Sequence, residues 1–234
     1  MLTVTPGTHA HDVELDDTFD FLNTYELQDG VPVDHLPDLS IALDWFVNRG
    51  VIHMEGADRI RAIYESRPAI VERDLSKIRS VRRSLRELAD AIVEERTPDS
   101  GAIATVNRAL HARQVIELVA APNGCSVDHR HVGDPIDDAL ARIADPMVRE
   151  LADGHPDRIR VCANDRCQWV FYDNSRSGRR RWCDMTTCGN RAKAARHRAK
   201  AKSVEPAVEP AMTTAQAGLE ATAGADGSSV SLRA

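Results

Sequence analysis

The sequence has no long hydrophobic run and no basic residue near its beginning. No stretch approaches the about 20 consecutive apolar residues that a membrane-spanning helix needs, so we expect no membrane contact. The first 20 residues contain acids but no Lys or Arg, and they lack the basic start and apolar run of a secretory signal. These absences predict a protein of a reducing compartment, and we expect it in the cytoplasm.

Catalytic motifs are missing as well. The chain has no P-loop, no G-x-G-x-x-G fingerprint and no recognisable pairing of a nucleophile with a base. We therefore do not expect an enzyme. An alternative stays open, in which an active site lies in the N-terminal part and any metal is purely structural.

The two signs of charge are unevenly distributed along the chain. The formal net charge is only -6, from 30 basic and 36 acidic residues. Between Arg158 and Lys202, however, there are 13 basic and three acidic residues, a net charge of +10, while the remainder has 17 basic and 33 acidic residues, a net charge of -16. An asymmetry of this kind indicates a nucleic-acid or membrane contact at one end of a chain.

Four of the five cysteines lie in the same basic segment, in the pattern C-x4-C-x15-C-x4-C formed by Cys162, Cys167, Cys183 and Cys188. Two cysteine pairs separated by a loop can close over one tetrahedral Zn²⁺, and four thiolates leave no open coordination position. We therefore expect one structural zinc. Four ordinary buried thiols, or a site in which His197 replaces one cysteine, are the alternatives.

The hydrophobic periodicity predicts an α+β protein, mainly helical before residue 154. We expect a first helix that begins near Asp16, with Phe19, Leu22 and Tyr25 or Leu27 on one face, and an interruption at residues 31–33 (Val-Pro-Val). Further helices should cover residues 39–48, 57–65, 69–95, 98–112 and 134–152, with paired strands at 114–120 and 126–132. The segment that contains the four cysteines should have a ββα-like form. Its elements are two short strands near residues 159–162 and 169–172 and a helix over 184–202.

Turn residues and composition divide the chain into four regions. We predict a flexible stretch over 1–14, a helical domain for sensing or dimerisation over 15–154, a zinc-binding domain over 155–202 and a disordered tail over 203–234. The boundary at residues 154–157 reads Gly-His-Pro-Asp, and a domain as small as the third region needs a metal to hold it.

The basic residues of the zinc-binding region are candidate nucleic-acid contacts. An ordinary solvated face mixes both signs of charge, but residues 189–202 contain no acid at all. Contact with an acidic protein, including docking of the acidic N-terminal part when the protein is idle, is the alternative. Asn190 could read a base or cap the backbone near the metal. The candidate contacts are Arg179, Arg180, Arg181, Asn190, Arg191, Lys193, Arg196, Arg198 and Lys200.

Asn23 and Thr24 are polar residues on an otherwise apolar helix face of the N-terminal part. Buried polar groups need partners, so this pair could bind other helices or line a ligand pocket together with Trp45. The simplest interpretation of Trp45 is a core residue. A small-molecule effector and a homodimer are thus further candidate partners.

The finger region resembles the CGNR zinc finger, which is named after the tetrapeptide at residues 188–191. The resembling residues are Cys162 to Cys167, Phe171, Asp173, Ser175, Arg176, Arg179 to Cys183 and Cys188 to Lys193. Residues 19–24 (FDFLNT) and 43–45 (LDW) are similar to the ABATE domain that usually precedes this finger. The resemblance implies a stress-induced transcriptional regulator with DNA, rather than RNA, as the partner of the basic residues.

Overall fold

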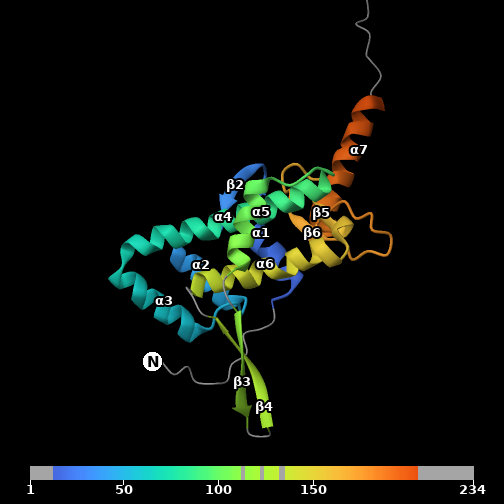
Figure 1. Ribbon diagram of the computed structural model, residues 1–234. Helices are drawn as coiled ribbons and strands as arrows, with labels where there is room; N and C mark the ends of the chain where they lie inside the picture. Colours follow the sequence, from blue (N-terminus) through green and yellow to red (C-terminus); the bar gives the residue numbers. More distant parts are fainter. Residues whose placement is uncertain (1–12, 112–113, 122–123, 132–134, 205–234) are drawn as a thin grey trace, which may run out of the picture. The chain divides into compact units, whose positions relative to one another are not determined.

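The computed structural model describes residues 13–111, 114–121, 124–131 and 135–204 (Figure 1). The described residues up to Ala195 belong to one compact unit, and those from Arg196 belong to a second. Within the described residues no helix is both long enough and apolar enough to cross a membrane. The helices are α1 (Leu15–Asn23), α2 (Leu39–Asn48), α3 (Met54–Ser66), α4 (Pro68–Val93), α5 (Ser100–Leu110), α6 (Pro135–Asp153) and α7 (Asn190–Val204).

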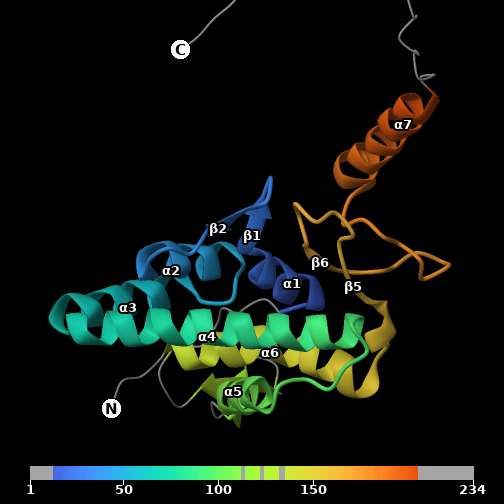
Figure 2. The same ribbon diagram turned by 90° about the horizontal axis from the view of Figure 1, so that it is seen from above.

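The core of the first unit is built around the 26-residue helix α4. Its buried residues Ile78, Val81, Leu85 and Leu88 recur at the three- and four-residue spacing that places side chains on one helix face. Helices α5 and α6 pack against this helix and against each other, as Figure 2 shows. The predicted apolar stripe is therefore the face that the fold buries.

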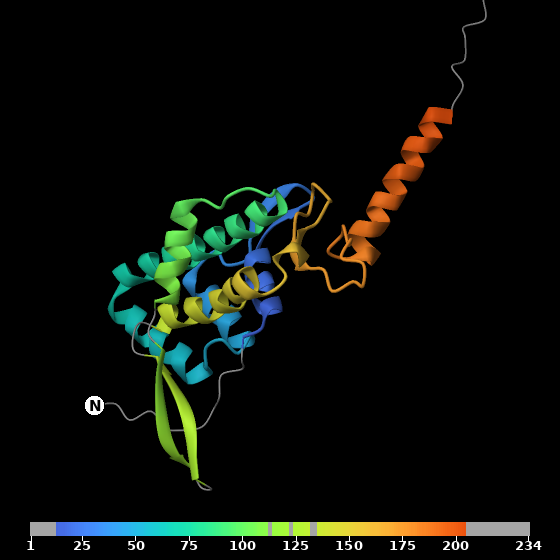
Figure 3. The same ribbon diagram turned by 45° about the vertical axis from the view of Figure 1, so that its right-hand side comes forward.

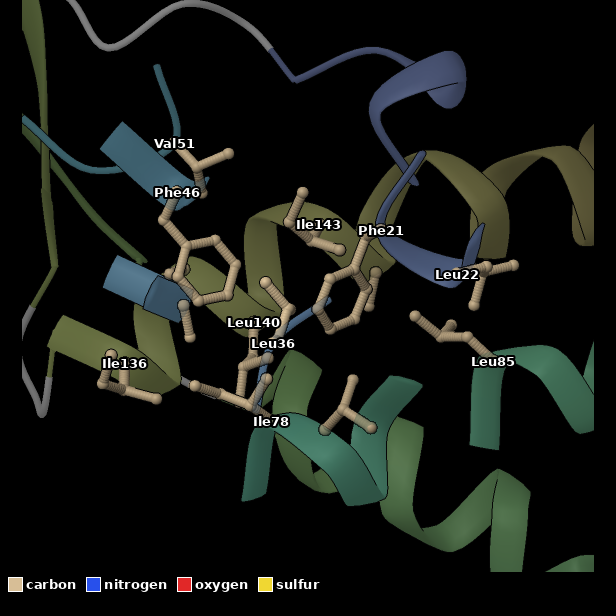
Figure 4. Close-up of a cluster of buried hydrophobic side chains, with 14 of the residues drawn as sticks. Phe21, Leu22, Leu36, Phe46, Val51, Ile78, Leu85, Ile136, Leu140 and Ile143 are labelled. Atoms are coloured by element: carbon tan, nitrogen blue, oxygen red, sulfur yellow. The ribbon is translucent and has the colours of Figure 1, made fainter. Parts of the chain in front are cut away.

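Helices α1 and α2 contribute aromatic rings to the same core (Figure 4). Phe21 and Phe46 are fully buried, and their ring centroids lie 6.0 Å apart. Ile143 of α6 and Leu36, which precedes α2, are buried in the same cluster. At about 25 cal/mol per Å² of apolar surface removed from water, each such side chain stabilises the fold by about 2 kcal/mol.

Among the described residues, three separate two-stranded antiparallel sheets accompany the helices. They are formed by β1 (Tyr25–Gln28) with β2 (Val31–Asp34), β3 (Gln114–Ala121) with β4 (Gly124–His131), and β5 (Ile159–Val161) with β6 (Val170–Tyr172). The second pair is the twisted hairpin that is easily followed in Figure 3. The predicted fold class, mainly helical with small antiparallel strand pairs, is confirmed.

The first hairpin corrects our interpretation of residues 25–28 as a continuation of the first helix. Asp29 and Gly30 have φ angles of 52° and 89° and form the turn of the hairpin. Asp-Gly is a strong hairpin signal because both residues tolerate the left-handed region. Pro32, expected only to interrupt, lies in β2 opposite Leu27, since a two-stranded sheet has free edges where proline is tolerated.

The strands of the zinc-binding region join the helical core. Ile159 and Val170 are each 1% exposed and belong to the same buried cluster as Phe21 and Ile143. Strand β5 packs against α4, and β6 packs against α1 (Figure 2). The regions before and after residue 154 therefore share one hydrophobic core. Sensing or dimerisation, the role assigned to the region before residue 154, stays a prediction.

The last helix begins later than predicted. Residues 185–189 form a single π-helical turn, and α7 starts at Asn190 instead of Asp184. Of the predicted tail, residues 203 and 204 end α7, and residues 205–234 lie outside the described residues. Residues 1–12 also lie outside the described residues. The flexible N-terminal stretch and the disordered tail therefore stay predictions.

Candidate metal centre

The sulfur atoms of Cys162, Cys167, Cys183 and Cys188 all lie within 4.8 Å of one another. The separation is 3.6 Å between the sulfurs of Cys167 and Cys183 and 3.8 Å between those of Cys183 and Cys188. Two sulfurs on a tetrahedral zinc, each about 2.3 Å from the ion, would lie about 3.8 Å apart. The four cysteines are thus positioned to bind one metal ion.

The first cysteine pair is held by a tight turn between β5 and β6. The backbone N–H of Cys162 donates to the carbonyl of Trp169 at 2.8 Å, and the N–H of Cys167 donates to the carbonyl of Asn164 at 2.8 Å. Gln168 completes the turn with a left-handed φ of 57°. The x4 spacing therefore leaves enough chain for a full turn that brings both sulfurs to the same side.

The second pair is shaped by the π-helical turn. Asp184 accepts hydrogen bonds from the hydroxyl of Thr186 at 2.6 Å and from the backbone N–H and the hydroxyl of Thr187 at 2.8 and 3.0 Å, and these bonds lower the pKa of its carboxyl group. A side chain at Gly189 would begin 2.8 Å from the Met185 sulfur and methyl group and 3.5 Å from the Trp182 ring. Gly189 thus makes room for these packing residues and serves no left-handed turn.

Asn164 is a residue of the site that our sequence reasoning missed. Its side-chain amide donates to the Cys188 sulfur at 3.3 Å, and its side-chain oxygen accepts from the N–H of Arg166 at 3.2 Å. Groups that bind the metal ligands orient them and affect metal affinity strongly. The signal available in the sequence was a short polar residue two positions after the first cysteine, inside the turn.

Without a metal the cluster does not ionise evenly. Burial raises the pKa of Cys167 to about 11 and raises that of Cys183 further, and the nearby Cys162 thiol adds to both shifts. Burial also opposes ionisation of Cys188, but the hydrogen bonds from Asn164 and the neighbouring thiols outweigh it and lower its pKa. Four thiolates this close together need a cation to balance them.

The residues present fit zinc in both number and chemistry. Four cysteine sulfurs at tetrahedral separation are the ligand set of a structural zinc site, and none of the four forms a disulfide. Two of them, Cys162 and Cys188, are buried. Bound zinc would be coordinatively saturated here, so the chemistry it supplies is cross-linking of the finger.

Comparison with protein-family models agrees with this geometry. The model of the CGNR zinc finger matches residues 158–201. The ABATE model, described as a putative stress-induced transcription regulator, matches residues 18–154, which is more than half of the chain. The chain belongs to the ABATE family. No curated protein matches it.

The basic residues of this ABATE protein separate into two groups. Arg180 faces inward, where its guanidinium lies 4.9 Å from the centroid of the Phe171 ring and donates to the carbonyls of Trp182, at 2.8 Å, and Cys183. Its backbone N–H donates to the buried Asp173 at 2.7 Å. The sequence makes Arg180 a candidate nucleic-acid contact, but these bonds occupy its side chain within the finger.

The other predicted contacts are exposed. They are Arg179 and Arg181 in the loop before the second cysteine pair, and Arg191, Lys193, Arg196, Arg198 and Lys200 on α7. Arg181 lies over the Trp182 ring, 5.2 Å from its centroid. Asn190 is exposed too, but its side-chain amide donates to the carbonyl of Thr186 at 2.9 Å, at the junction between the π turn and α7.

The residues of the predicted ligand pocket make contacts within the protein. Asn23 makes two hydrogen bonds to the backbone of Val170, and the Thr24 hydroxyl donates to the carbonyl of Phe21 at 2.6 Å and accepts from Arg82 at 2.8 Å. Trp45 packs against Phe21, with ring centroids 5.7 Å apart. The partners that these buried polar groups require are other parts of the protein.

Two cavities in the described part of the chain are lined by other residues. An apolar cavity of about 300 Å³ lies among α4, α5 and α6, with Leu88, Val106 and Leu151 in its wall. A more polar one of about 260 Å³ lies between α4 and the first cysteine turn, where Arg86 and Gln168 line it. Neither includes Asn23, Thr24 or Trp45.

Proposed function

We propose that this protein is a zinc-dependent, DNA-binding transcription regulator. The family description supports the regulatory role, and the four-cysteine site supports a zinc-stabilised finger. The observation that carries the proposal is an acid-free helix that begins two residues after the ligand Cys188. No acidic residue occurs between Asp184 and the end of α7. A reducing compartment such as the cytoplasm suits both the thiolates and the proposed partner.

The exposed cations of the finger are available to phosphate groups. Within the described part of the chain, the Arg179 side chain makes no hydrogen bond or ion pair, and the Arg181 side chain lies over the Trp182 ring without an acidic partner. Arg191 lies 3.4 Å from the carboxylate of Asp29, and both side chains are well exposed, at 65% and 73%. Exposed pairs of this kind contribute at most about 1 kcal/mol, so a phosphate could replace Asp29.

The spacing of cations on α7 fits a groove with phosphates on both sides. A residue turns by about 100° along a helix, so Lys193, Arg196 and Lys200 share one side. Arg191 and Arg198, seven residues apart, share the opposite side, and small alanines lie between the two groups. A helix in the major groove of DNA has a phosphate backbone on each side of it.

A salt titration tests the proposal. We expect the zinc-loaded full chain to bind random duplex DNA with an affinity that falls steeply with salt, because each neutralised phosphate releases about 0.9 counterions. The double variant Lys193→Ala with Arg196→Ala should lower the slope of log K against log [salt] by about 2. Fluorescence anisotropy of labelled duplex measures the slope.

The matched control is Arg149→Ala, which removes an exposed arginine from α6 that pairs with Asp145 at 2.6 Å. Its slope should equal that of the unmodified chain. DNA affinity that is absent, or that does not change with salt, would contradict the proposal and favour a zinc-stapled adaptor that binds a protein.

A further inference from the structure

The backbone of Trp169 and Val170 lies between the metal ligands and the N-terminal part of the chain. On the metal side, the Trp169 carbonyl accepts from the N–H of Cys162 at 2.8 Å. The Trp169 N–H also interacts with the Cys167 thiol, and this interaction opposes the larger effect of burial, which raises the pKa of that thiol. This short segment therefore contacts both ligands of the first cysteine pair.

On the other side, the same segment is bound by Asn23 at the end of α1. The Asn23 side-chain amide donates to the Val170 carbonyl at 2.9 Å, and its side-chain oxygen accepts from the Val170 N–H at 2.9 Å. Strand β6 has β5 along one edge, so Asn23 satisfies the other edge as a neighbouring strand would. The partners are 147 residues apart in the sequence.

A second contact fixes the Trp169 side chain. Its indole N–H donates to the carboxylate of Glu26 on β1. Glu26 also accepts from Gln28 and lies 2.8 Å from the His35 ring, and these bonds lower its pKa against the opposing effect of burial. Two residues close in sequence, Asn23 and Glu26, thus hold the backbone and the side chain of consecutive finger residues.

We propose that Asn23 is a positioning residue of the zinc site. It touches no sulfur, but it fixes the backbone that bonds to Cys162 and Cys167. Asn23 is 8% exposed and Val170 is 1% exposed, so water cannot easily replace a lost amide. Removing the amide leaves the buried Val170 N–H and carbonyl unpaired. The loss of stability then affects the segment that contacts the first cysteine pair, Cys162 and Cys167.

Coupling of this kind is reciprocal. If the docking of α1 increases the affinity for zinc, bound zinc increases the stability of the docked α1 by the same factor. The N-terminal part then has a route to the finger, because any event that moves the end of α1 changes how firmly the metal is held. This inference concerns metal retention and does not depend on DNA binding.

Zinc release from the loaded full chain under native conditions tests the proposal. With excess chelator and a colorimetric zinc indicator, Asn23→Ala should release zinc about tenfold faster than the unmodified chain, within the range seen when groups that support metal ligands are removed. Asn23→Asp should also release zinc faster, because it keeps the acceptor for the Val170 N–H but loses the donor to the carbonyl.

Thr18→Val is the matched control. Thr18 is on the same helix and fully buried, and its hydroxyl donates to a backbone carbonyl, that of Ile143 in α6, at 2.7 Å. This variant should lower the free energy of unfolding but leave zinc release within about twofold of the unmodified rate. A general loss of stability is thereby separated from a loss of positioning.

A milder variant keeps the test decisive if Asn23→Ala does not fold. Trp169→Phe removes the indole N–H that binds Glu26 but keeps an aromatic ring, and it should accelerate zinc release by a smaller factor than Asn23→Ala. Unchanged release in a folded Asn23→Ala chain would overturn the proposal. Equal acceleration in Thr18→Val would overturn it as well, and so would an unchanged rate in Trp169→Phe when Asn23→Ala is unfolded.

Discussion

At the scale of single residues, the sequence predicts ligands better than it predicts orientation. The four cysteines follow from their spacing alone, because few other patterns bring four sulfurs together. Arginine is different, since its long side chain can bind solvent, phosphate or backbone carbonyls. Arg179, Arg180 and Arg181 are adjacent and identical in sequence, yet only the Arg180 side chain donates to the carbonyls of Trp182 and Cys183.

Arg180 and Arg179 should therefore respond differently to substitution. Arg180→Ala removes two hydrogen bonds and the contact with Phe171, and we expect a loss of about 2 kcal/mol in the free energy of unfolding. Arg179→Ala should leave stability unchanged and reduce the slope of log K against log [salt] for DNA by about 1. Urea unfolding and the salt titration measure the two quantities. Equal effects of the two variants on stability would contradict this assignment.

At the scale of elements, the hydrophobic periodicity locates helices with regular apolar faces. It does not locate the residues at which a helix gives way to a strand or to a π-helical turn. Helices α4 and α6 lie within a few residues of their predicted ends. Strand β1 was wrongly expected to continue the first helix, because Tyr25 or Leu27 extends the helical spacing of α1, while residues 31–33 were expected only to interrupt it. The Asp29-Gly30 turn outweighs that spacing, since a left-handed pair cannot continue a helix.

The turn should be sensitive to a side chain at Gly30. With φ at 89°, an alanine there is strained whatever the space, so Gly30→Ala should destabilise the protein by about 1 kcal/mol. Gly56→Ala in α3 is the control, because Gly56 has an ordinary helical backbone and its new Cβ would lie 3.4 Å from Ile52. It should be neutral or stabilising by up to about 1 kcal/mol. Urea unfolding compares the two, and equal effects would contradict the strained turn.

At the scale of the whole molecule, the charge distribution predicts two regions of different function, but not how they are joined. The join depends on single contacts between residues far apart in sequence, such as the bonds from Asn23 to Val170 and from Tyr172 to Glu150 at 2.7 Å. No periodicity encodes such a pair. A buried Asn in an apolar helix face signals only that a partner exists, and the fold identifies it.

Because Ile159 and Val170 are buried in the helical core, removing zinc should destabilise the N-terminal helices as well as the finger. We expect chelation to lower the urea midpoint measured by far-UV circular dichroism, which reports mainly on the helices, by an amount equivalent to at least about 2 kcal/mol, since zinc binding free energy contributes to folding. Adding zinc back should restore the midpoint.

Cys183→Ser supplies the control for this experiment. It removes one ligand, so the variant should bind less zinc, should unfold near the midpoint of the chelated protein and should respond little to chelator. A finger that folds as an independent domain predicts the opposite result, an unchanged helical transition after chelation with a separate loss of structure in the finger. The shared core argues for the coupled result, because β5 and β6 cannot leave it without exposing apolar side chains on α1 and α4 to water.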